Sequence, residues 1–542
     1  MHAWYNEDMK NANQVLALPD QRTYYNAVQL SLPINTLLAL DQEDEVFSFL
    51  DAVKGVDFSK YVKPIRSNNT NSHDRGMLIR TMLFGYMNGI NTLSTLVSLC
   101  RTDLRYLFLS NEEKPSIMAF SRMCRDLTVS IDDLFFKVSG IIAEKMNCDT
   151  NVQYIDGTKI EANANKNSFV YKKRIVNAMD RLFFRITDDV IRLNQEYGYA
   201  YPYSSCYGAY DMWNICQYLM EVMVRENIRI VYGKGCRKNE FQVWYDTFMQ
   251  YALKLDEYEY WLEIMGNRNS CSKTDHDATM MATKWDYYNQ SGVTRACYNC
   301  QIAVSNGIIV NSEVYQDVGD TTTYQPFMEK YHRHTGKYPG YPVADAGYGS
   351  YDNYLYNITH RCHLTMKYNL YGKEHDKRFQ KRRFNSHNWK KTEDGNVICP
   401  DDRVFDQYEK DVCRNTAGGN LTITQIYYEK DKCEGCPFRK ECLQNPDGYR
   451  RYSRNVIRDE MWETVNRELS TEEGIQMKTQ RSVQVEGAFG VIKQDFGFTR
   501  FHRKGMKNVK MEFLLVCLGY NLKKFHIYRL RQMRIDPSGM MS

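Results

Sequence analysis

Hydrophobic and polar positions follow a helical period through most of residues 1–147. Apolar residues recur every three or four positions in MLIRTMLFGYMNGI from Met77 and in STLVSLCRTDLRYLFL from Ser94. A third short helix, AFSRMCRDL, is predicted from Ala119. Three short helices with tight turns are typical of a helix-turn-helix DNA reader, but also of an ordinary helical bundle. We therefore predict a helical N-terminal domain and leave both roles open.

A strand period begins after this helical region. The segment VQYIDGTKIEANA predicts a strand, a turn at Asp156 and Gly157, and a second strand. Residues 166–268 return to helical spacing and are interpreted as an insertion. Alternation resumes in CYNCQIAVSNGIIVNSEVYQ, where Asn306-Gly307 predicts a hairpin turn.

Further strand and helix patterns follow the hairpin. A helix is predicted in DTTTYQPFMEKYHRHTG, with Asp320 as its candidate cap. A short strand then ends at Asp345, and a further strand is predicted in CHLTMKYN from Cys362. Hairpin strands followed by a strand, a helix and a strand predict a mixed α/β sheet with helices on its faces.

Composition limits the class of protein. The chain has 542 residues, of which 43% are hydrophobic and 25% charged, so two to four folded units are expected rather than one small binding module. The apolar run from Met511 is too short to cross a membrane, and the first residues lack the pattern of a secretory signal. We therefore expect a cytoplasmic protein without a membrane partner, whose 16 cysteines are mostly reduced.

The basic residues are unevenly distributed. The net charge is only +5, yet residues 493–534 hold eleven Lys and Arg against two acids. Residues 373–391 hold eight against two, with Phe379, Phe384 and Trp389 between them. Basic stretches with interleaved aromatic residues are typical of phosphate contact with base stacking, and a solvated basic face is the alternative.

Three carboxylates are candidate catalytic groups. Asp156 and Asp345 lie at or near predicted strand ends, where catalytic groups can converge, and Glu486 lies in the helical stretch QRSVQVEGAFGVIKQDF. Three such carboxylates can hold two divalent cations for an in-line displacement at a phosphodiester, and oxygen ligands favour Mg²⁺ or Mn²⁺. In a helix, Glu486 and Lys493 would project from one face, so that a metal ligand and a phosphate-binding lysine border one groove.

The sequence segments around these carboxylates resemble those of a known family. Five segments resemble the DDE transposases of bacterial insertion sequences, in particular the group of insertion sequence eleven-eighty-two. They are YIDGTKIEANANKNSFVYKK, SKTDHDAT, YNCQIAVSNGIIVNSEVYQDVGDTTTYQPF, ADAGYGSYDNY and RSVQVEGAFGVIKQDFGFTRFHRKG. HDRGMLIRTMLFGYMNGI and PSIMAFSRMCRDL are similar to the N-terminal domain of that group. The resemblance therefore extends over nearly the whole chain.

This resemblance implies a fold and an activity. It implies a ribonuclease H-like catalytic core, with Asp156, Asp345 and Glu486 binding two Mg²⁺ or Mn²⁺ ions. It implies cleavage of double-stranded DNA at terminal inverted repeats, joining of the ends to target DNA, and a homodimer on paired ends. The alternatives are a general metal-dependent nuclease and a catalytically inactive or domesticated transposase-derived DNA-binding protein.

The domain boundaries expected on this basis are the following. Residues 1–147 form the helical domain that binds DNA ends, 148–165 and 269–372 the first parts of the catalytic core, 166–268 a helical insertion, 373–470 a basic, Cys-containing insertion, and 471–542 the Glu486 helix with the basic C-terminal region.

Several basic residues are candidate DNA contacts. The related transposase signature places Tyr, Arg, Glu and Lys at fixed intervals, and here Glu486 and Lys493 keep the last interval. The Arg and Tyr positions hold Ser482 and Thr479, and Arg481 is the nearest basic residue. The set of candidate DNA contacts is Lys493, Arg481, Lys159, Arg500, Arg503 and Lys504.

The remaining chemical motif is a cysteine cluster. Cys433-x2-Cys436-x5-Cys442 is one close pair with a third thiol nearby, and Cys399 is a distant fourth candidate. Zinc bound by these four cysteines would stabilise an insertion that otherwise lacks a core. An iron–sulfur cluster and metal-free reduced thiols remain the alternatives.

Overall fold

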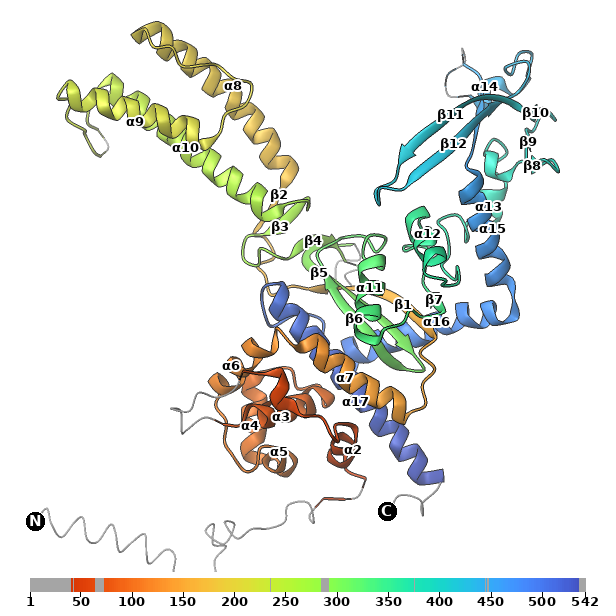
Figure 1. Ribbon diagram of the computed structural model, residues 1–542. Coiled ribbons are helices and arrows are strands. Elements are labelled where there is room, and N and C mark those ends of the chain that lie inside the picture. Colours follow the sequence, from red (N-terminus) through yellow and green to blue (C-terminus); the bar gives the residue numbers. More distant parts are fainter. Residues whose placement is uncertain are drawn as a thin grey trace, which may run out of the picture.

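A five-stranded mixed sheet lies at the centre of the computed structural model (Figure 1), which describes residues 40–41, 43–63, 73–233, 235–283, 292–374, 376–443, 445 and 448–535. Residues 1–39 of the expected N-terminal domain lie outside this part. The strands of the sheet are β1 (Val152–Glu161), β4 (Thr279–Ala282), β5 (Thr294–Ser305), β6 (Ile308–Tyr315) and β7 (Tyr341–Val343). The predicted mixed α/β character is confirmed.

Strand β5 organises this sheet. It pairs antiparallel with β1 along one edge, and with β4 and β6 at the two ends of its other edge. Strand β7 is parallel to β1. The β5–β6 connection is the predicted hairpin, in which Asn306 and Gly307 both have positive φ, at 48° and 82°. Since few residues other than Asn and Gly adopt this conformation readily, the dipeptide specifies the turn.

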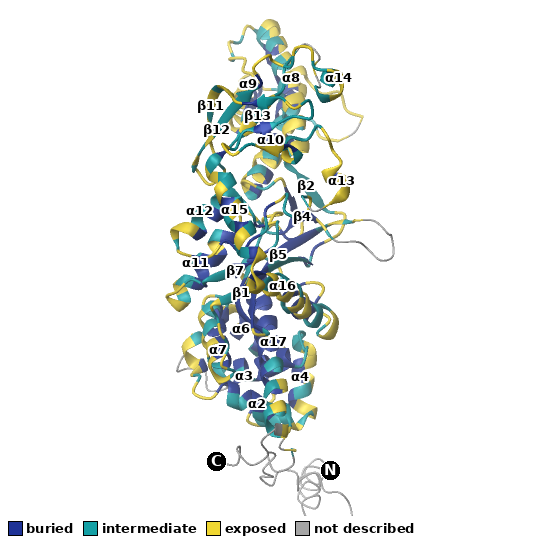
Figure 2. Cartoon of the chain, turned by 90° about the vertical axis from the view of Figure 1, so that its right-hand side faces the viewer, coloured by how far each residue is buried: buried dark blue, intermediate teal, exposed yellow. Residues whose placement is uncertain are grey.

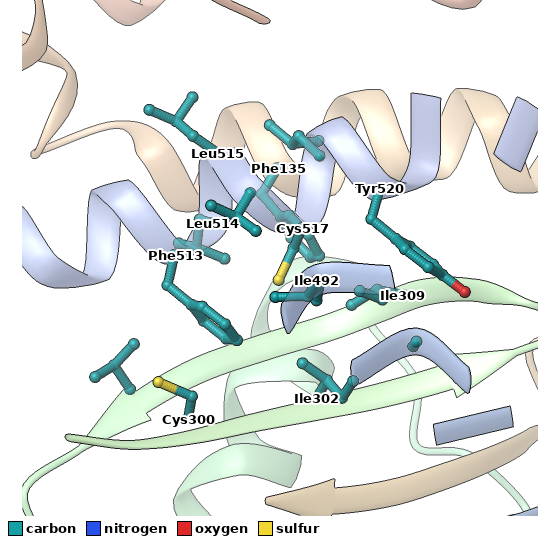
Figure 3. Packing of buried hydrophobic residues seen from close by; sticks show 14 of the residues in the cluster. Phe135, Cys300, Ile302, Ile309, Ile492, Phe513, Leu514, Leu515, Cys517 and Tyr520 are labelled. Carbon is teal, nitrogen blue, oxygen red and sulfur yellow. The ribbon is translucent and has the colours of Figure 1, made fainter. Parts of the chain in front are cut away.

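Helices cover both faces of the sheet. Helix α11 (Tyr324–Thr335) lies on one face, where Asn311 of β6 donates a 2.8 Å hydrogen bond to the Phe327 carbonyl, and α12 (Tyr351–Thr359) packs beside α11. Helices α16 (Glu472–Gly490) and α17 (Met506–Ile535) belong to the opposite face. Figure 3 shows Phe513, Leu514 and Cys517 of α17 packed over Cys300 and Ile302 of β5 and Ile309 of β6.

The N-terminal helices pack onto α17 rather than forming a separate core. They are α2 (Glu45–Ala52), α3 (Arg75–Met87), α4 (Leu93–Thr102), α5 (Leu104–Leu109), α6 (Ile117–Leu127) and α7 (Ile131–Lys145), with a 3₁₀ turn at Phe58–Tyr61. Helix α17 crosses α3 so closely that a Cβ atom at Gly519 would lie 2.4 Å from the Tyr86 carbonyl oxygen. One continuous apolar cluster therefore joins the N-terminal helices, α17 and the sheet.

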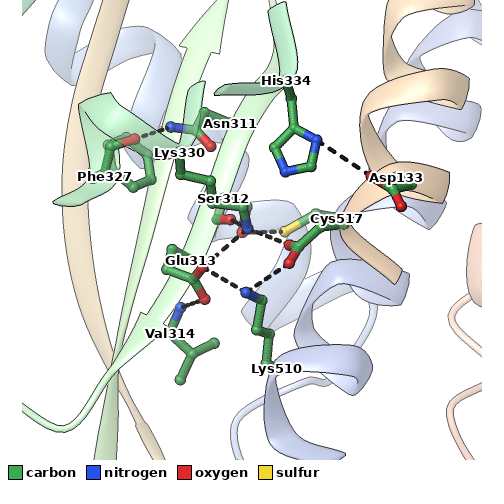
Figure 4. A network of polar contacts seen from close by, with 11 residues as sticks. Asp133, Asn311, Ser312, Glu313, Val314, Phe327, Lys330, His334, Lys510 and Cys517 are labelled. Atoms are coloured by element: carbon green, nitrogen blue, oxygen red, sulfur yellow. Dashed lines mark hydrogen bonds and ion pairs between the residues drawn. The ribbon is translucent and has the colours of Figure 1, made fainter. Parts of the chain in front are cut away.

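A buried ion-pair network connects these layers (Figure 4). The Lys330 amine of α11 lies 2.6 Å from Asp132 of α7 and 3.2 Å from Glu313 of β6. The Lys510 amine of α17 lies 2.8 and 2.7 Å from the same two carboxylates. The side chain of Lys330 is only 6% exposed, so its charge depends on these partners.

Two extensions project from the central body (Figure 1). The first consists of α8 (Lys172–Tyr197), α9 (Ala209–Arg225) and α10 (Glu240–Met265) between the paired strands β2 (Phe169–Tyr171) and β3 (Ser270–Ser272). These helices have an apolar core of their own, which includes Ile186, Leu219 and Phe248. In Figure 2 buried residues concentrate in the sheet and the N-terminal helices, whereas the extensions are mostly exposed or intermediate.

The second extension contains the cysteine cluster and small sheets. Its elements are α13 (Lys377–Gln380), a 3₁₀ turn at Ser386–Asn388, β8 (Lys390–Lys391), β9 (Val397–Ile398), β10 (Val404–Phe405), β11 (Gln407–Asn415), β12 (Leu421–Tyr428), α14 (Arg439–Cys442) and β13 (Arg451–Arg454). Helix α15 (Val456–Ser470) leads from it to α16. A small apolar cluster of Trp389, Val397 and Phe405 packs beside Cys399 and Cys442.

Three local predictions are wrong. Strand β1 runs without interruption through Asp156 and Gly157, where a turn was expected, because β5 pairs with it along the whole segment. The strand expected from Cys362 is reduced to one bridge between Met366 and Ala344. Asp320 does not cap α11, which begins at Tyr324 after Thr323, because its carboxylate binds side-chain amides instead.

Within the described ranges, no helix combines the length and the apolar character that crossing a membrane requires.

Candidate active site

The parallel pairing of β1 and β7 brings Asp156 and Asp345 to the same level of the sheet. Tyr154 pairs with Val343, and each aspartate follows its paired residue by two positions. Strand β7 ends at Val343, so Asp345 lies in the following turn, where its Oδ1 accepts a 2.8 Å hydrogen bond from the Gly347 amide. Two carboxylates that are distant in sequence thus become neighbours where β7 ends beside the interior of β1.

The surroundings of Asp156 perturb its ionisation. Burial raises the pKa of Asp156 above its usual value, and the nearby carboxylates of Asp345 and Asp320 act in the same direction. Arg481 opposes them, because its Nη1 lies 3.2 Å from the Asp156 Oδ2. A buried carboxylate beside like charges requires a cation, and Arg481 supplies it in this structure.

Helix α16 carries both Arg481 and Glu486. It packs against β1, β5 and β7, and its N-terminus is capped by Thr471, whose hydroxyl accepts from the Gly474 amide. Val485 is buried against the sheet, whereas the neighbouring Glu486 is exposed. The structure therefore brings Asp156 and Asp345 together, with Glu486 on the helix that lies against them.

The three carboxylates do not form a preassembled ligand set. Among the described side chains, no group of three or more His, Cys, Asp or Glu residues has an arrangement that could hold a metal ion. Two features of the site account for this at the carboxylates. Arg481 occupies one oxygen of Asp156, and Glu486 is turned toward solvent.

Lys493 contacts strand β1, but from a π-helical segment rather than from the α-helix that was expected. The helix changes to π-helical turns at Val491–Asp495, so the α-helical spacing between Glu486 and Lys493 does not persist to the lysine. The Lys493 amine donates a 2.6 Å hydrogen bond to the Thr158 hydroxyl. Thr158 and Asp156 share one face of β1, because side chains alternate along a strand. Arg481 and Lys493 therefore contact adjacent positions on that face.

Sequence reasoning missed two residues near the carboxylates. Burial lowers the pKa of Lys367, and the charges of Arg481 and Lys478 lower it further, whereas Asp345 opposes them. Lys367 therefore lies among the basic residues at the site, although its segment was interpreted as a plain strand. Asp320 was interpreted as a cap, and its buried partners on β5 could be identified only after the strands were paired.

The other candidate DNA contacts differ in how they are engaged. The guanidinium of Arg500 donates to the carbonyls of Ala162 and Ala164, at 3.2 and 2.9 Å. That of Arg503 donates to the Cys124 sulfur at 3.1 Å. Lys504 is exposed and Lys159 is partly buried. Together with Arg481 and Lys493, four of the six candidates thus have structural contacts that DNA would have to share or replace.

Aromatic residues of the 373–391 stretch do not form an exposed stacking surface. Phe379 and Trp389 are each only 7% exposed, and the Trp389 indole donates to the Arg383 carbonyl. Phe384 lies 6.0 Å from Phe438, with Arg383 over the Phe438 ring. The expected stacking on Phe379 and Trp389 is wrong, because both rings are buried, that of Trp389 in the apolar cluster of the Cys-containing extension.

The four cysteines of the candidate metal site line one small cavity. Cys399, Cys433, Cys436 and Cys442 border a space of about 20 Å³, together with the side chains of Arg403, Arg439 and Arg450. Burial raises the pKa of the Cys442 thiol, and the other three cysteines raise it further. The positive φ angles of Cys433 and Gly435, 60° and 68°, form a tight turn between the close pair.

The backbone of this turn is held by charged side chains. The buried Glu429 carboxylate accepts hydrogen bonds from the amides of Asp431 and Cys433, at 2.9 and 2.8 Å. Arg439 donates to the Cys433 carbonyl at 3.0 Å. The turn therefore has fixed partners on both sides of Cys433.

Comparison with known proteins gives one family. Residues 398–526 match a family model described as "Transposase DDE domain". This range includes the cysteine cluster, Glu486, Lys493 and most of α17, but neither Asp156 nor Asp345. No curated protein and no solved structure matches the chain. The match confirms the resemblance to DDE transposases and leaves the particular insertion-sequence group unidentified.

Proposed function

We propose, from the match of residues 398–526 to the transposase DDE domain model, that the chain is a metal-dependent transposase with a ribonuclease H-like core. It would cut DNA at the terminal inverted repeats of an insertion sequence and join the ends to target DNA. The observation that carries the proposal is the parallel register of β1 and β7. It brings Asp156 and Asp345 side by side next to α16, the helix that bears Arg481 and Glu486. Asp156, Asp345 and Glu486 are the proposed catalytic triad.

The donor chemistry of this site suits a hard divalent cation. The candidate ligands are carboxylate oxygens, which Mg²⁺ and Mn²⁺ prefer. Two such ions, when bound, supply activation of the attacking oxygen and stabilisation of the leaving oxygen. Because Arg481 contacts Asp156 and Glu486 is exposed, ion binding requires Arg481 to release one carboxylate oxygen and Glu486 to turn inward.

The basic residues have a separate role in this proposal. Arg481, Lys493 and Lys367 gather at the carboxylates, where they would bind the phosphates that flank the cleaved bond. Released from Asp156, Arg481 can donate two parallel hydrogen bonds to a phosphate. This exchange would leave Asp156 ionised for the cation and hold the DNA strand at the same time.

Outside the catalytic core, the proposal assigns DNA contacts to more distant parts. Lys159, Arg500, Arg503 and Lys504 would contact the DNA backbone, and the N-terminal helices would bind the transposon ends. Two copies of the chain would hold a pair of ends. The protein would act in the bacterial cytoplasm, associated with the nucleoid when bound to DNA.

Cleavage of the element's own end tests this function. Full-length protein is incubated in Mg²⁺ or Mn²⁺ with a labelled duplex carrying the inverted repeat that flanks its gene. Nicking at the repeat end is expected, and its loss in both Asp156→Ala and Glu486→Ala would support the triad. Cleavage that persists in either variant would refute it. Binding without cleavage would favour the inactive DNA-binding alternative, and cleavage without regard to the repeat a general nuclease.

We also propose a structural zinc ion at Cys399, Cys433, Cys436 and Cys442. The shared cavity and the neighbouring arginines support it, because a zinc ion with four thiolates carries a net negative charge that Arg403, Arg439 and Arg450 would offset. The thiols of this structure are not yet arranged as a ligand set. Zinc binding would draw them together around the cavity.

Metal analysis of the purified protein tests the zinc proposal. We expect one zinc per chain, lost in Cys433→Ser and retained in Cys413→Ser, since Cys413 is an exposed thiol of the same extension. Iron with visible absorbance would indicate an iron–sulfur cluster instead. A protein without either metal, or with equal zinc in both variants, would refute the assignment.

A further inference from the structure

A network of buried amides lies beside the two aspartates. It consists of Asn299 and Gln301 on β5, Asp320 before α11, and Tyr348 in the turn after Asp345. The Oδ1 atom of Asp320 accepts hydrogen bonds from Asn299 Nδ2 at 2.8 Å and Gln301 Nε2 at 2.9 Å. Asn299 and Gln301 are 1% and 0% exposed. We call these four residues the amide network.

Asp320 and Asn299 together determine which way the Gln301 amide points, because the Gln301 Nε2 donates to the Oδ1 of each, at 2.9 and 3.1 Å. An ionised carboxylate only accepts hydrogen bonds, so the NH₂ group of Gln301 must face it. The Gln301 Oε1 then faces the buried Tyr348 hydroxyl, which donates a hydrogen bond to it. The contact between Gln301 and Tyr348 thus depends on the two acceptors of the Gln301 amide nitrogen, Asp320 and Asn299.

Tyr348 belongs to the turn that carries Asp345. The amide of Tyr348 donates to the Asp345 carbonyl at 3.2 Å, and that of Gly347 donates to the Asp345 carboxylate at 2.8 Å. Thr321, which follows Asp320, donates from its hydroxyl to the Gly347 carbonyl at 2.8 Å. The turn is therefore attached to β5 through Gln301 and to the segment before α11 through Thr321.

The same network lies against the residue that follows Asp156. Gly157 pairs with Gln301 across the two strands, and a Cβ atom at Gly157 would lie 2.2 Å from the Gln301 Nε2 and 3.0 Å from the Asp320 Oδ1. The glycine is needed here for the space its missing side chain leaves, not for a turn. Gln301 therefore contacts the surroundings of both aspartates.

We propose that Gln301 and Asp320 are positioning residues, which hold the Asp345 turn at a fixed place relative to Asp156 and thereby set the affinity of this carboxylate pair for a divalent cation. The inference rests on the proposed function, because it assumes that Asp156 and Asp345 bind the cation. Neither Gln301 nor Asp320 needs to touch the ion. Outer residues that orient metal ligands commonly change metal affinity 10- to 100-fold when they are replaced.

A Mn²⁺ titration of the full-length protein without DNA, followed by the paramagnetic resonance of free Mn²⁺, tests the proposal. Gln301→Leu keeps a side chain of similar size but removes both hydrogen-bonding groups. We expect its Kd for Mn²⁺ to rise about 10- to 100-fold. Cleavage of the repeat duplex should need correspondingly more Mn²⁺ and recover at high concentration, which a general folding defect would not produce.

Tyr298→Phe is the matched control. Tyr298 is a buried tyrosine of the same strand, and its hydroxyl donates to Asp275, also buried, rather than to the Asp345 turn. The substitution removes a buried contact of β5 with Asp275, whereas Gln301→Leu removes the contacts with Asp320, Asn299 and Tyr348, so both variants should lose thermal stability and Gln301→Leu the more. Only Gln301→Leu should lose Mn²⁺ affinity.

Asp320→Asn provides a second variant if Gln301→Leu does not fold. It preserves size and allows the Gln301 amide to turn, so we expect weaker Mn²⁺ binding than in the unaltered protein. Unaltered affinity in Gln301→Leu or Asp320→Asn, with the unaltered protein binding and cleaving, would overturn this inference alone. A protein that binds no Mn²⁺, or that binds it equally well as Asp156→Ala, would overturn the proposed metal site and this inference with it.

Discussion

Arg481 is expected to compete with the metal ion for Asp156. Its Nη1 lies 3.2 Å from the Asp156 Oδ2, and the two side chains are only 15% and 22% exposed. A hydrogen bond to a charged partner in such a position contributes about 1.5–3 kcal/mol. On the proposed function, a cation would have to displace this contact, so the ion pair would reduce the affinity of Asp156 for the cation.

Replacing Arg481 by methionine should therefore tighten Mn²⁺ binding while weakening DNA cleavage. Since 1.4 kcal/mol corresponds to a tenfold change, the Kd for Mn²⁺ should fall by roughly 10- to 100-fold. Cleavage should fall because a phosphate contact is lost. Loss of Arg481 also raises the pKa of Asp156, since the guanidinium lowers it, so the titration is made near pH 8 to keep the carboxylate ionised.

Lys478→Met is the control for this experiment. Lys478 precedes Arg481 on the same helix, but its amine donates a 3.0 Å hydrogen bond to the Tyr371 hydroxyl rather than to Asp156. Lys478→Met removes one positive charge, as Arg481→Met does, so a general electrostatic effect on Mn²⁺ binding should appear in both variants. An unchanged or weaker affinity for Mn²⁺ in Arg481→Met, with the control also unchanged, would refute the competition.

Two further predictions concern stability. Lys330→Met removes one of the two lysines that pair with Asp132 and Glu313, so the local free energy of unfolding should fall by about 3–5 kcal/mol. Amide hydrogen exchange in α7 and β6 measures this fall. Protection equal to that of the unaltered protein would contradict the prediction. The pKa of His502 is raised by its hydrogen bond to Glu512, so its stabilising contribution is complete below pH about 6.5 and is lost as the pH rises through the folded-state value. Denaturation of the unaltered protein and His502→Gln from pH 5.5 to 8.5 should show curves that converge at high pH, and a constant difference would contradict the assignment.

Local signals predicted much of the sheet. Asn306-Gly307 specifies its hairpin by backbone conformation alone, and the alternation around Asp156 indicates a strand. Gly157 misled the prediction because a glycine in an extended segment usually marks a turn or a bulge. Here the reason for the glycine is a contact with Gln301, which lies far along the chain and cannot be inferred before the strands are paired.

In the candidate site, too, contacts between distant parts of the chain could not be predicted from local sequence. Asp156 and Asp345 were selected by the resemblance of the segments around them, since a position near a strand end does not by itself distinguish a catalytic aspartate. The parallel register then made them neighbours. The contacts of Arg481 and Lys493 depend on how α16 crosses the sheet and on a π-helical segment that periodicity does not reveal. Asp320 has the local pattern of a cap, and only tertiary structure supplies the amides that bind its carboxylate instead.

The position of α17 has a consequence for how the protein folds during synthesis. Helices α2–α7 leave the ribosome first, yet the apolar surface that they share with α17 stays exposed until that late helix has been made. Gly519 of α17 then docks against α3, and Lys510 joins the ion pairs that connect α7 to the sheet. A chain interrupted before α17 would therefore expose a large apolar surface for chaperones and proteases to recognise. Because Asp156, Asp345 and Glu486 all precede α17, the three proposed catalytic residues would already have been translated when this helix completes the core.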